Sequence, residues 1–382
     1  DEVARLREAN IEEGTADQER LAGQSRQEAD AAIRRIVGEE KSAAFYSFVR
    51  DYWISGGEQV AGDKTASAGN GLLAGPNAVP KDTRVVVNIP AYRMDVFREG
   101  SLVKSYKIGI GYPDFPLPTG LRKAQSIIFN PTWTPPDEPW VAKMKGVEVG
   151  EKVAAGSKLN PLGPIKIPIG LPSLIHGGKS TAKLGTHASH GCVGLTTPQV
   201  QDFSKLLAQV AGTELPEQQL QSYLKNKTKT ETVKLGQAIP VELRYETIVV
   251  EDGKLHIYRD VYDHDTNTEA NLRAVLAANG VQFETLSQDE QSQILDALTA
   301  MGGRAQTAAS QPKTSPTPEA KTAASPKTGE SKVAVARPKK PIGKNQKEVV
   351  IEIASLKGKG YPTAVKLDTG SGKPAAMIAA VR

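Results

Sequence analysis

The only cysteine of this 382-residue chain, Cys192, lies in a run of residues whose types could carry out nucleophilic chemistry. His187 and His190 precede it closely, and His176 stands sixteen positions before it. A thiol attacks as its thiolate, so near pH 7 it needs a base or a positive environment. The spacing predicts that Cys192 is the nucleophile and His176 its base. His176 would end one strand and Cys192 would begin the next element, so antiparallel pairing could bring them together.

Two glycines extend this arrangement. Gly191 lets the backbone turn tightly before Cys192, so that amide groups there can point at a developing oxyanion. Gly177 leaves the carbonyl that follows His176 accessible. A carbonyl can hold one imidazole nitrogen and so fix the tautomer of the ring.

Other interpretations of the same residues stay open. Buried cysteines are often inert, and a lone histidine is often structural. Thiolate and imidazole are also good zinc ligands, but none of the spacings fits a usual ligand pair. The zinc alternative would use four side chains, those of His176, His187, His190 and Cys192. We therefore expect no metal and no cofactor.

Composition narrows the class of protein. A formal charge of +5 and a pI near 9.0 suit work beside a polyanion. The basic residues are not clustered with aromatic residues, so nucleic acid is a poor candidate partner. A single cysteine excludes an internal disulfide framework. No run reaches the roughly 18 apolar residues of a membrane span, and we expect no transmembrane segment.

The elements that must position these residues follow from periodicity and turn residues. Closely spaced strands with Gly/Pro turns predict a mostly β catalytic domain, an antiparallel sandwich or barrel, preceded by a helical N-terminal segment and followed by short helices. A hairpin turn is predicted at 98–101. A strand over 239–250 is expected to pair with 255–258. We expect a helical region at 1–60, a connector at 61–80 and the catalytic domain at 81–262. Short helices at 263–302, a disordered linker at 303–346 and a small C-terminal segment at 347–382 would follow.

A proline-rich run at 130–140 contains Trp133 and Trp140. It predicts a rigid loop with aromatic packing that also acts as a lid over a groove. We expect both tryptophans, together with Ser189, to contact the substrate.

The run Ser189–Cys192, preceded by His176-Gly177, resembles the signature of the L,D-transpeptidases with a YkuD catalytic domain. The resemblance covers roughly residues 80 to 262. Further motifs resemble the same family, namely those at 87–91, 96–97, 118–120, 130–135 and 160–163.

The resemblance implies a β-sandwich domain that cross-links peptidoglycan stem peptides, a donor tetrapeptide and an acceptor amine. Cys192 would be the acylated nucleophile, His176 the proton donor and acceptor, and Gly177 the residue whose carbonyl orients His176. His190 would shape the motif, and the amides of His190, Gly191 and Cys192 would form the oxyanion hole. It also implies work in the periplasm or cell envelope. Because the chain begins with an aspartate, we expect an exported protein whose signal peptide has been removed.

One departure from the family pattern concerns the residue two positions after the nucleophile, which is usually arginine and here is Gly194. The cation that would hold a substrate carboxylate is therefore unassigned, with Arg122, Lys143 and Lys179 as candidates. His187 is not a family position, and we expect it in an exposed loop. Alternatives to transpeptidation are an L,D-carboxypeptidase or amidase with the same thiol chemistry, or a non-catalytic wall-binding protein.

Overall fold

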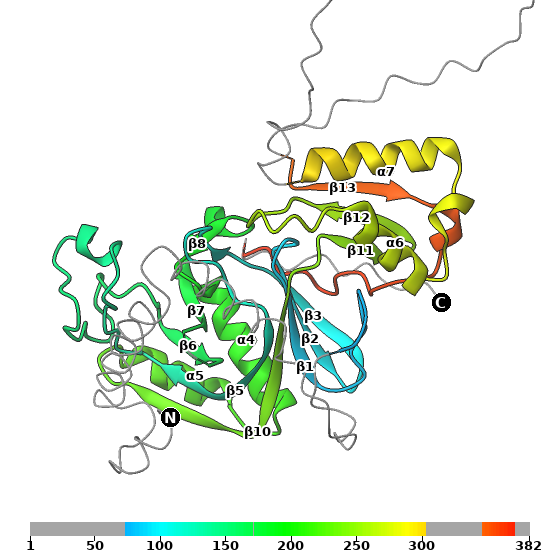
Figure 1. Cartoon of the computed structure of the whole chain (residues 1–382). Helices are drawn as coiled ribbons and strands as arrows, with labels where there is room; N and C mark the ends of the chain where they lie inside the picture. Colours follow the sequence, from blue (N-terminus) through cyan, green and yellow to red (C-terminus); the bar gives the residue numbers. More distant parts are fainter. Residues whose placement is uncertain (1–72, 171, 303–345, 371–382) are drawn as a thin grey trace, which may run out of the picture. The chain divides into compact units, whose positions relative to one another are not determined.

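The computed structural model describes residues 73–170, 172–302 and 346–370 (Figure 1). The helical region predicted for 1–60 lies outside the described residues, as do most of the connector and the linker. Among the described residues, no helix has the length and apolar character that crossing a membrane requires.

Eight strands form one sheet in the order β3-β2-β1-β10-β5-β6-β7-β9. Neighbours are mostly antiparallel, but β1 runs parallel to β10, and β7 runs parallel to β9. The bounds are Arg84–Asn88 (β1), Arg93–Arg98 (β2), Ser101–Lys107 (β3), Gly120–Phe129 (β5), Ile165–Pro168 (β6), Leu174–Lys179 (β7), Val193–Thr196 (β9) and Glu231–Arg244 (β10).

The hairpin predicted at 98–101 joins β2 to β3. Glu99 and Gly100 both have positive φ, 49° and 79°, as a two-residue type I′ turn requires. The strand pairing predicted for 239–250 is confirmed only for its end, because this stretch divides. Its first part belongs to β10, which pairs with β1 and β5 in the main sheet, and only its end pairs with 255–258.

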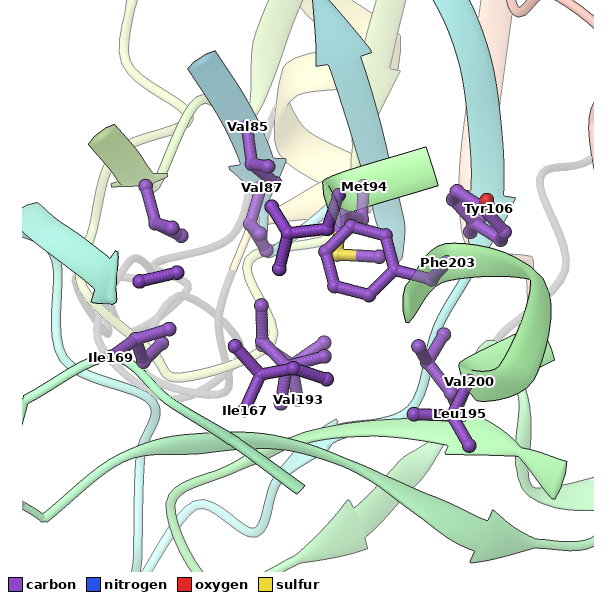
Figure 2. Close-up of a cluster of buried hydrophobic side chains, with 14 of the residues drawn as sticks. Val85, Val87, Met94, Tyr106, Ile167, Ile169, Val193, Leu195, Val200 and Phe203 are labelled. Carbon is purple, nitrogen blue, oxygen red and sulfur yellow. The ribbon is translucent and has the colours of Figure 1, made fainter. Parts of the chain in front are cut away.

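The sheet curls so that strands from its two halves face one another across one core. In Figure 2, Val85 and Val87 of β1 lie on one side of the cluster and Ile167 of β6 and Val193 of β9 on the other. Val200 and Phe203 of helix α4 (Thr197–Val210) fill a further side of this core. The prediction of a mostly β catalytic domain is confirmed, with a single curled sheet in place of two separate ones.

A second hydrophobic cluster lies around a three-stranded sheet in the order β11-β12-β13, formed by Ile248–Glu251, Lys254–Tyr258 and Glu348–Glu352. Two helices contribute to this cluster, α6 (Glu269–Ala278) and α7 (Gln288–Met301), together with the short turns η3 (Phe283–Thr285) and η5 (Ala354–Leu356). After β13 the chain returns to the main sheet, where Ser105 and Lys107 of β3 donate to the carbonyls of Val365 and Asp368.

Short elements complete the surroundings of β7 and β9. A two-stranded parallel pair joins β4 (Ile110–Gly111) to β8 (His187–Ser189). Helix α4 begins directly after β9, where Thr196 and Gln199 form a capping box. The remaining elements are the helix α5 (Glu217–Lys225) and the turns η1 (Val141–Lys143) and η2 (Thr181–Lys183).

Candidate active site

The pairing of β7 with β9 brings His176 and Cys192 to one face of the sheet. Cys192 directly precedes β9, and the register sets Ile175 opposite Val193 and His176 opposite Gly194. Because side chains alternate along a strand, Cys192, His176 and Gly194 lie on the same face, opposite the buried Ile175 and Val193. The expectation of antiparallel pairing is wrong. The two strands run parallel, and His176 is the third residue of β7 instead of its end.

The ring of His176 is buried, with 3% of its surface exposed. Its Nδ1 lies 2.8 Å from the carbonyl oxygen of Gly177. Since a carbonyl only accepts, Nδ1 of the neutral ring carries the proton and Nε2 keeps its lone pair. Burial, and then the charge of Lys179, lower the pKa of His176 to about 3, so the ring is neutral at pH 7.

Cys192 is partly exposed. Burial raises the pKa of its thiol, while the backbone of Leu174 and the charge of Lys179 act in the opposite direction. At neutral pH the site therefore holds a neutral imidazole with a lone pair and a thiol on the same face. Such a pair can pass the thiol proton to the ring as the sulfur attacks.

Ser189 occupies a position that does not fit the expected contact with substrate. Its side chain is 4% exposed, and its hydroxyl donates to the carbonyl of Cys192 at 2.5 Å and accepts from the N–H of Cys192 at 3.1 Å. The only proton of this hydroxyl is therefore donated to the backbone of the nucleophile. This also removes Cys192 from the predicted set of oxyanion amides, because its N–H already has an acceptor.

Gly191 has a φ of +86°, in the left-handed region that favours glycine. Among the hydrogen bonds of the described residues, none uses the backbone N–H of His190 or of Gly191. Two successive amides beside the thiol are therefore available to an oxygen ligand.

The imidazole of His190 is packed among aromatic rings. Trp140 stacks on it with ring centroids 3.9 Å apart and an interplanar angle of 8°. The ring centroids of Tyr112 and Phe115 lie 5.1 and 4.9 Å from the centroid of this imidazole. Sequence reasoning did not single out Tyr112 or Phe115, which come from the loop after β4. In the sequence, these two residues only form part of a run of strand and turn residues, and this run does not mark them as members of a site.

Trp133 and Trp140 have different positions in the 130–140 loop. The two rings stack at 6.0 Å, so Trp140 lies between Trp133 and His190. Trp133 is only 8% exposed and exchanges backbone hydrogen bonds with Val153. Its predicted contact with substrate does not fit this burial, whereas Trp140 is partly exposed beside the site.

We expected His187 in an exposed loop, and this prediction is wrong. It begins β8, pairs with Ile110, and stacks on Tyr262 at 6.0 Å. Burial lowers its pKa. The prediction failed because β8 is only three residues long and its partner β4 only two, so neither shows a periodic pattern.

The three candidate cations lie in different environments. Lys143 is exposed in η1. Arg122 lies on β5 with a buried Nε that has no hydrogen-bond partner, and burial lowers its pKa. Lys179 is partly buried at the end of β7, and its charge acts on His176, His190 and Cys192.

No group of three or more His, Cys, Asp or Glu side chains in the part of the chain that the structure describes is placed as metal ligands would be. The loop that ends in Gly163 instead packs directly on the backbone that follows His176. A Cβ on Gly163 would lie 2.6 Å from the N of Gly178. This contact explains why the 160–163 motif accompanies the histidine.

Comparison with known protein families gives one match. Residues 82–236 match the family model of the YkuD L,D-transpeptidase catalytic domain, as the resemblance of the motifs had predicted. The matched segment contains the whole constellation from His176 to Cys192. No curated protein matches the sequence.

Solved structures that match include L,D-transpeptidases of low sequence identity. One from Mycobacterium smegmatis is 16% identical with a TM-score of 0.26, over 43% of this chain and 59% of that one. The catalytic domain of the Enterococcus faecium enzyme is 16% identical with a TM-score of 0.28, over 43% of this chain and 98% of that one. This chain thus spans about three fifths of the length of the M. smegmatis protein.

Proposed function

We propose that the domain matched over residues 82–236 is a peptidoglycan L,D-transpeptidase that works through a Cys192 thioester. The observation that carries the proposal is the placement of Cys192 and a neutral, carbonyl-bound His176 on one face of two parallel strands. The family match supports a peptidoglycan stem peptide as the substrate class. The reaction would take place in the cell envelope, where that substrate lies.

In the first half-reaction, Nε2 of His176 takes the thiol proton while Sγ of Cys192 attacks the carbonyl carbon of the L,D bond in a donor tetrapeptide. The N–H groups of His190 and Gly191 stabilise the oxyanion. The protonated His176 then gives its proton to the departing amine of D-alanine. A C–S bond has formed and a C–N bond has broken, which leaves a thioester.

In the second half-reaction, an amine on another stem peptide attacks the thioester carbon. His176 accepts a proton from this amine, and the Cys192 sulfur leaves and is reprotonated. The ring returns to the neutral imidazole, which its low pKa favours at pH 7. The imidazolium therefore exists only as an intermediate. Gly177 would stabilise that intermediate, because its carbonyl favours the protonated ring.

The decisive experiment combines acylation with product analysis. Incubation with a carbapenem is expected to add one acyl group per chain, measured by intact mass, and Cys192→Ala should abolish the addition. With a defined tetrapeptide, the wild-type protein should release D-alanine and, with an acceptor amine present, give a cross-linked product. Acylation of the alanine variant would show that the nucleophile is misassigned. Exclusive release of a hydrolysed tripeptide would show a carboxypeptidase instead.

A further inference from the structure

The side chain of Lys179 occupies the space beside Gly194, which is where the family usually has an arginine. A Cβ on Gly194 would lie 2.9 Å from Cγ and 3.0 Å from Cε of Lys179. Gly194 is buried and is not among the residues with positive φ, so its backbone conformation does not demand glycine. The lysine stem instead fills the space that a side chain at this position would take.

The course of β7 explains how Lys179 reaches this space. His176 pairs with Gly194, but Lys179 pairs with Thr196, so three steps on β7 match two steps on β9. The extra residue is a bulge at Gly177-Gly178, and Gly178 has a φ of +82°. Without the bulge, Lys179 would point to the opposite face from His176. With it, Lys179 lies on the face that carries His176, Gly194 and Cys192.

Lys179 has no carboxylate partner within the described part of the chain, because none of the salt bridges there includes it. Burial lowers its pKa, the Cys192 thiolate raises it, and the neighbouring Lys183 lowers it again. A partly buried ammonium is costly unless an anion compensates it. When Cys192 ionises, its thiolate is the anion that this site provides.

We infer that Lys179 is the counter-ion of the Cys192 thiolate, and that the Gly177-Gly178 bulge and the missing side chain of Gly194 place it there. The inference deepens the proposed function and relies on it only in taking Cys192 as the nucleophile. It assigns Lys179 a positioning and electrostatic role. His176 remains the group that moves the proton.

The titratable groups around this thiol come from three elements. Lys179 and His176 lie on β7, His190 precedes the nucleophile, and Lys183 of η2 acts through Lys179. His176 is neutral, so the ammonium of Lys179 supplies the positive charge that acts directly on Cys192. Removing that charge should raise the pKa of the thiol.

The test uses the pH dependence of alkylation by iodoacetamide, which reports Cys192 alone because the chain has no other cysteine. Lys179→Met keeps the aliphatic stem and removes the charge. We expect its alkylation midpoint to move up by about one pH unit, which means roughly ten-fold slower alkylation at pH 7. Lys183→Met, which removes an exposed charge four positions away, should keep the wild-type midpoint. Lys179→Arg should keep it also.

An unchanged midpoint in a folded Lys179→Met protein would overturn the inference, and Lys179→Gln provides a second neutral variant if the first does not fold. An unchanged midpoint with a raised KM for the stem peptide would instead identify Lys179 as a ligand of the substrate carboxylate. Alkylation needs no peptidoglycan, so a shifted midpoint in a protein without transpeptidase activity would support the inference and reject the proposed function.

Discussion

The hydroxyl of Ser189 bonds both backbone polar groups of Cys192, donating to its carbonyl at 2.5 Å and accepting from its N–H at 3.1 Å. A residue three positions before the nucleophile thereby fixes the peptide units on both sides of it. The serine that begins the motif thus supports the backbone of the nucleophile.

Ser189→Ala is expected to lower the free energy of unfolding by about 1–3 kcal/mol, because it leaves polar backbone groups of Cys192 without partners. It should also slow acylation while KM stays close to the wild-type value. Urea unfolding and the kinetics of carbapenem acylation measure the two effects. Ser173→Ala is the matched control, since the Ser173 hydroxyl is buried with no hydrogen-bond partner and its removal should cost little. Equal effects of the two substitutions would contradict the role given to Ser189.

The low pKa of His176 predicts a loss of stability in mild acid. Between pH 6.5 and about 3 the unfolded chain binds a proton on this residue that the folded chain does not. Unfolding is therefore favoured as the pH falls, by about 1.4 kcal/mol per pH unit. His176→Asn should remove this part of the pH dependence, as measured by urea unfolding between pH 7 and 5.

The control for this prediction is Ile175→Val, at the residue before His176 in β7, which does not titrate. It should lower the free energy of unfolding by about 0.5–1.5 kcal/mol at every pH and leave the slope with pH as in the wild type. If His176→Asn keeps the wild-type slope, another group is responsible for the acid sensitivity.

The stack of Trp140 on His190 predicts that the 130–140 loop supports acylation. Trp140→Ala removes a contact with ring centroids 3.9 Å apart, and His190 carries one of the two amides proposed for the oxyanion. An aromatic pair contributes about 0.5–1.5 kcal/mol, so we expect acylation by a carbapenem to slow by roughly two- to ten-fold. Trp140→Phe keeps a stacked ring and should retain most of the rate. Wild-type rates in a folded Trp140→Ala protein would argue that the loop has no part in this step.

The contact between Lys179 and Gly194 predicts a strong coupling in a double-mutant cycle. Gly194→Ala alone should lower the free energy of unfolding by about 1–3 kcal/mol, because its methyl group meets the lysine stem. In a Lys179→Ala background the methyl group has room, and the same substitution should cost at least 0.5–1 kcal/mol less, roughly the coupling expected for contacting residues. Additive effects of the two substitutions would mean that the side chains do not share this space.

Much of the catalytic domain could be predicted from local patterns. The 98–101 hairpin follows from turn residues between apolar strands. Thr197-Pro198 predicts a helix start with Thr197 as the cap, and the structure places the capping threonine one residue earlier, at Thr196. Strand β13 lies some ninety residues after its partner β12, and no local pattern can assign such a pairing. For the same reason the division of 239–250 between two sheets was missed.

The sequence by itself determined which groups can react. Cys192 is the only thiol, the glycine beside it adopts a φ of +86° that other residues rarely take, and the carbonyl next to His176 is unobstructed by a side chain at Gly177. These properties belong to residue types and to immediate neighbours. Only the tertiary structure decided the direction of the β7–β9 pairing, the strand position of His187 and the place of Lys179. Each of these depends on strand register and on a bulge, which arise from contacts between segments and not from the residues within any one of them.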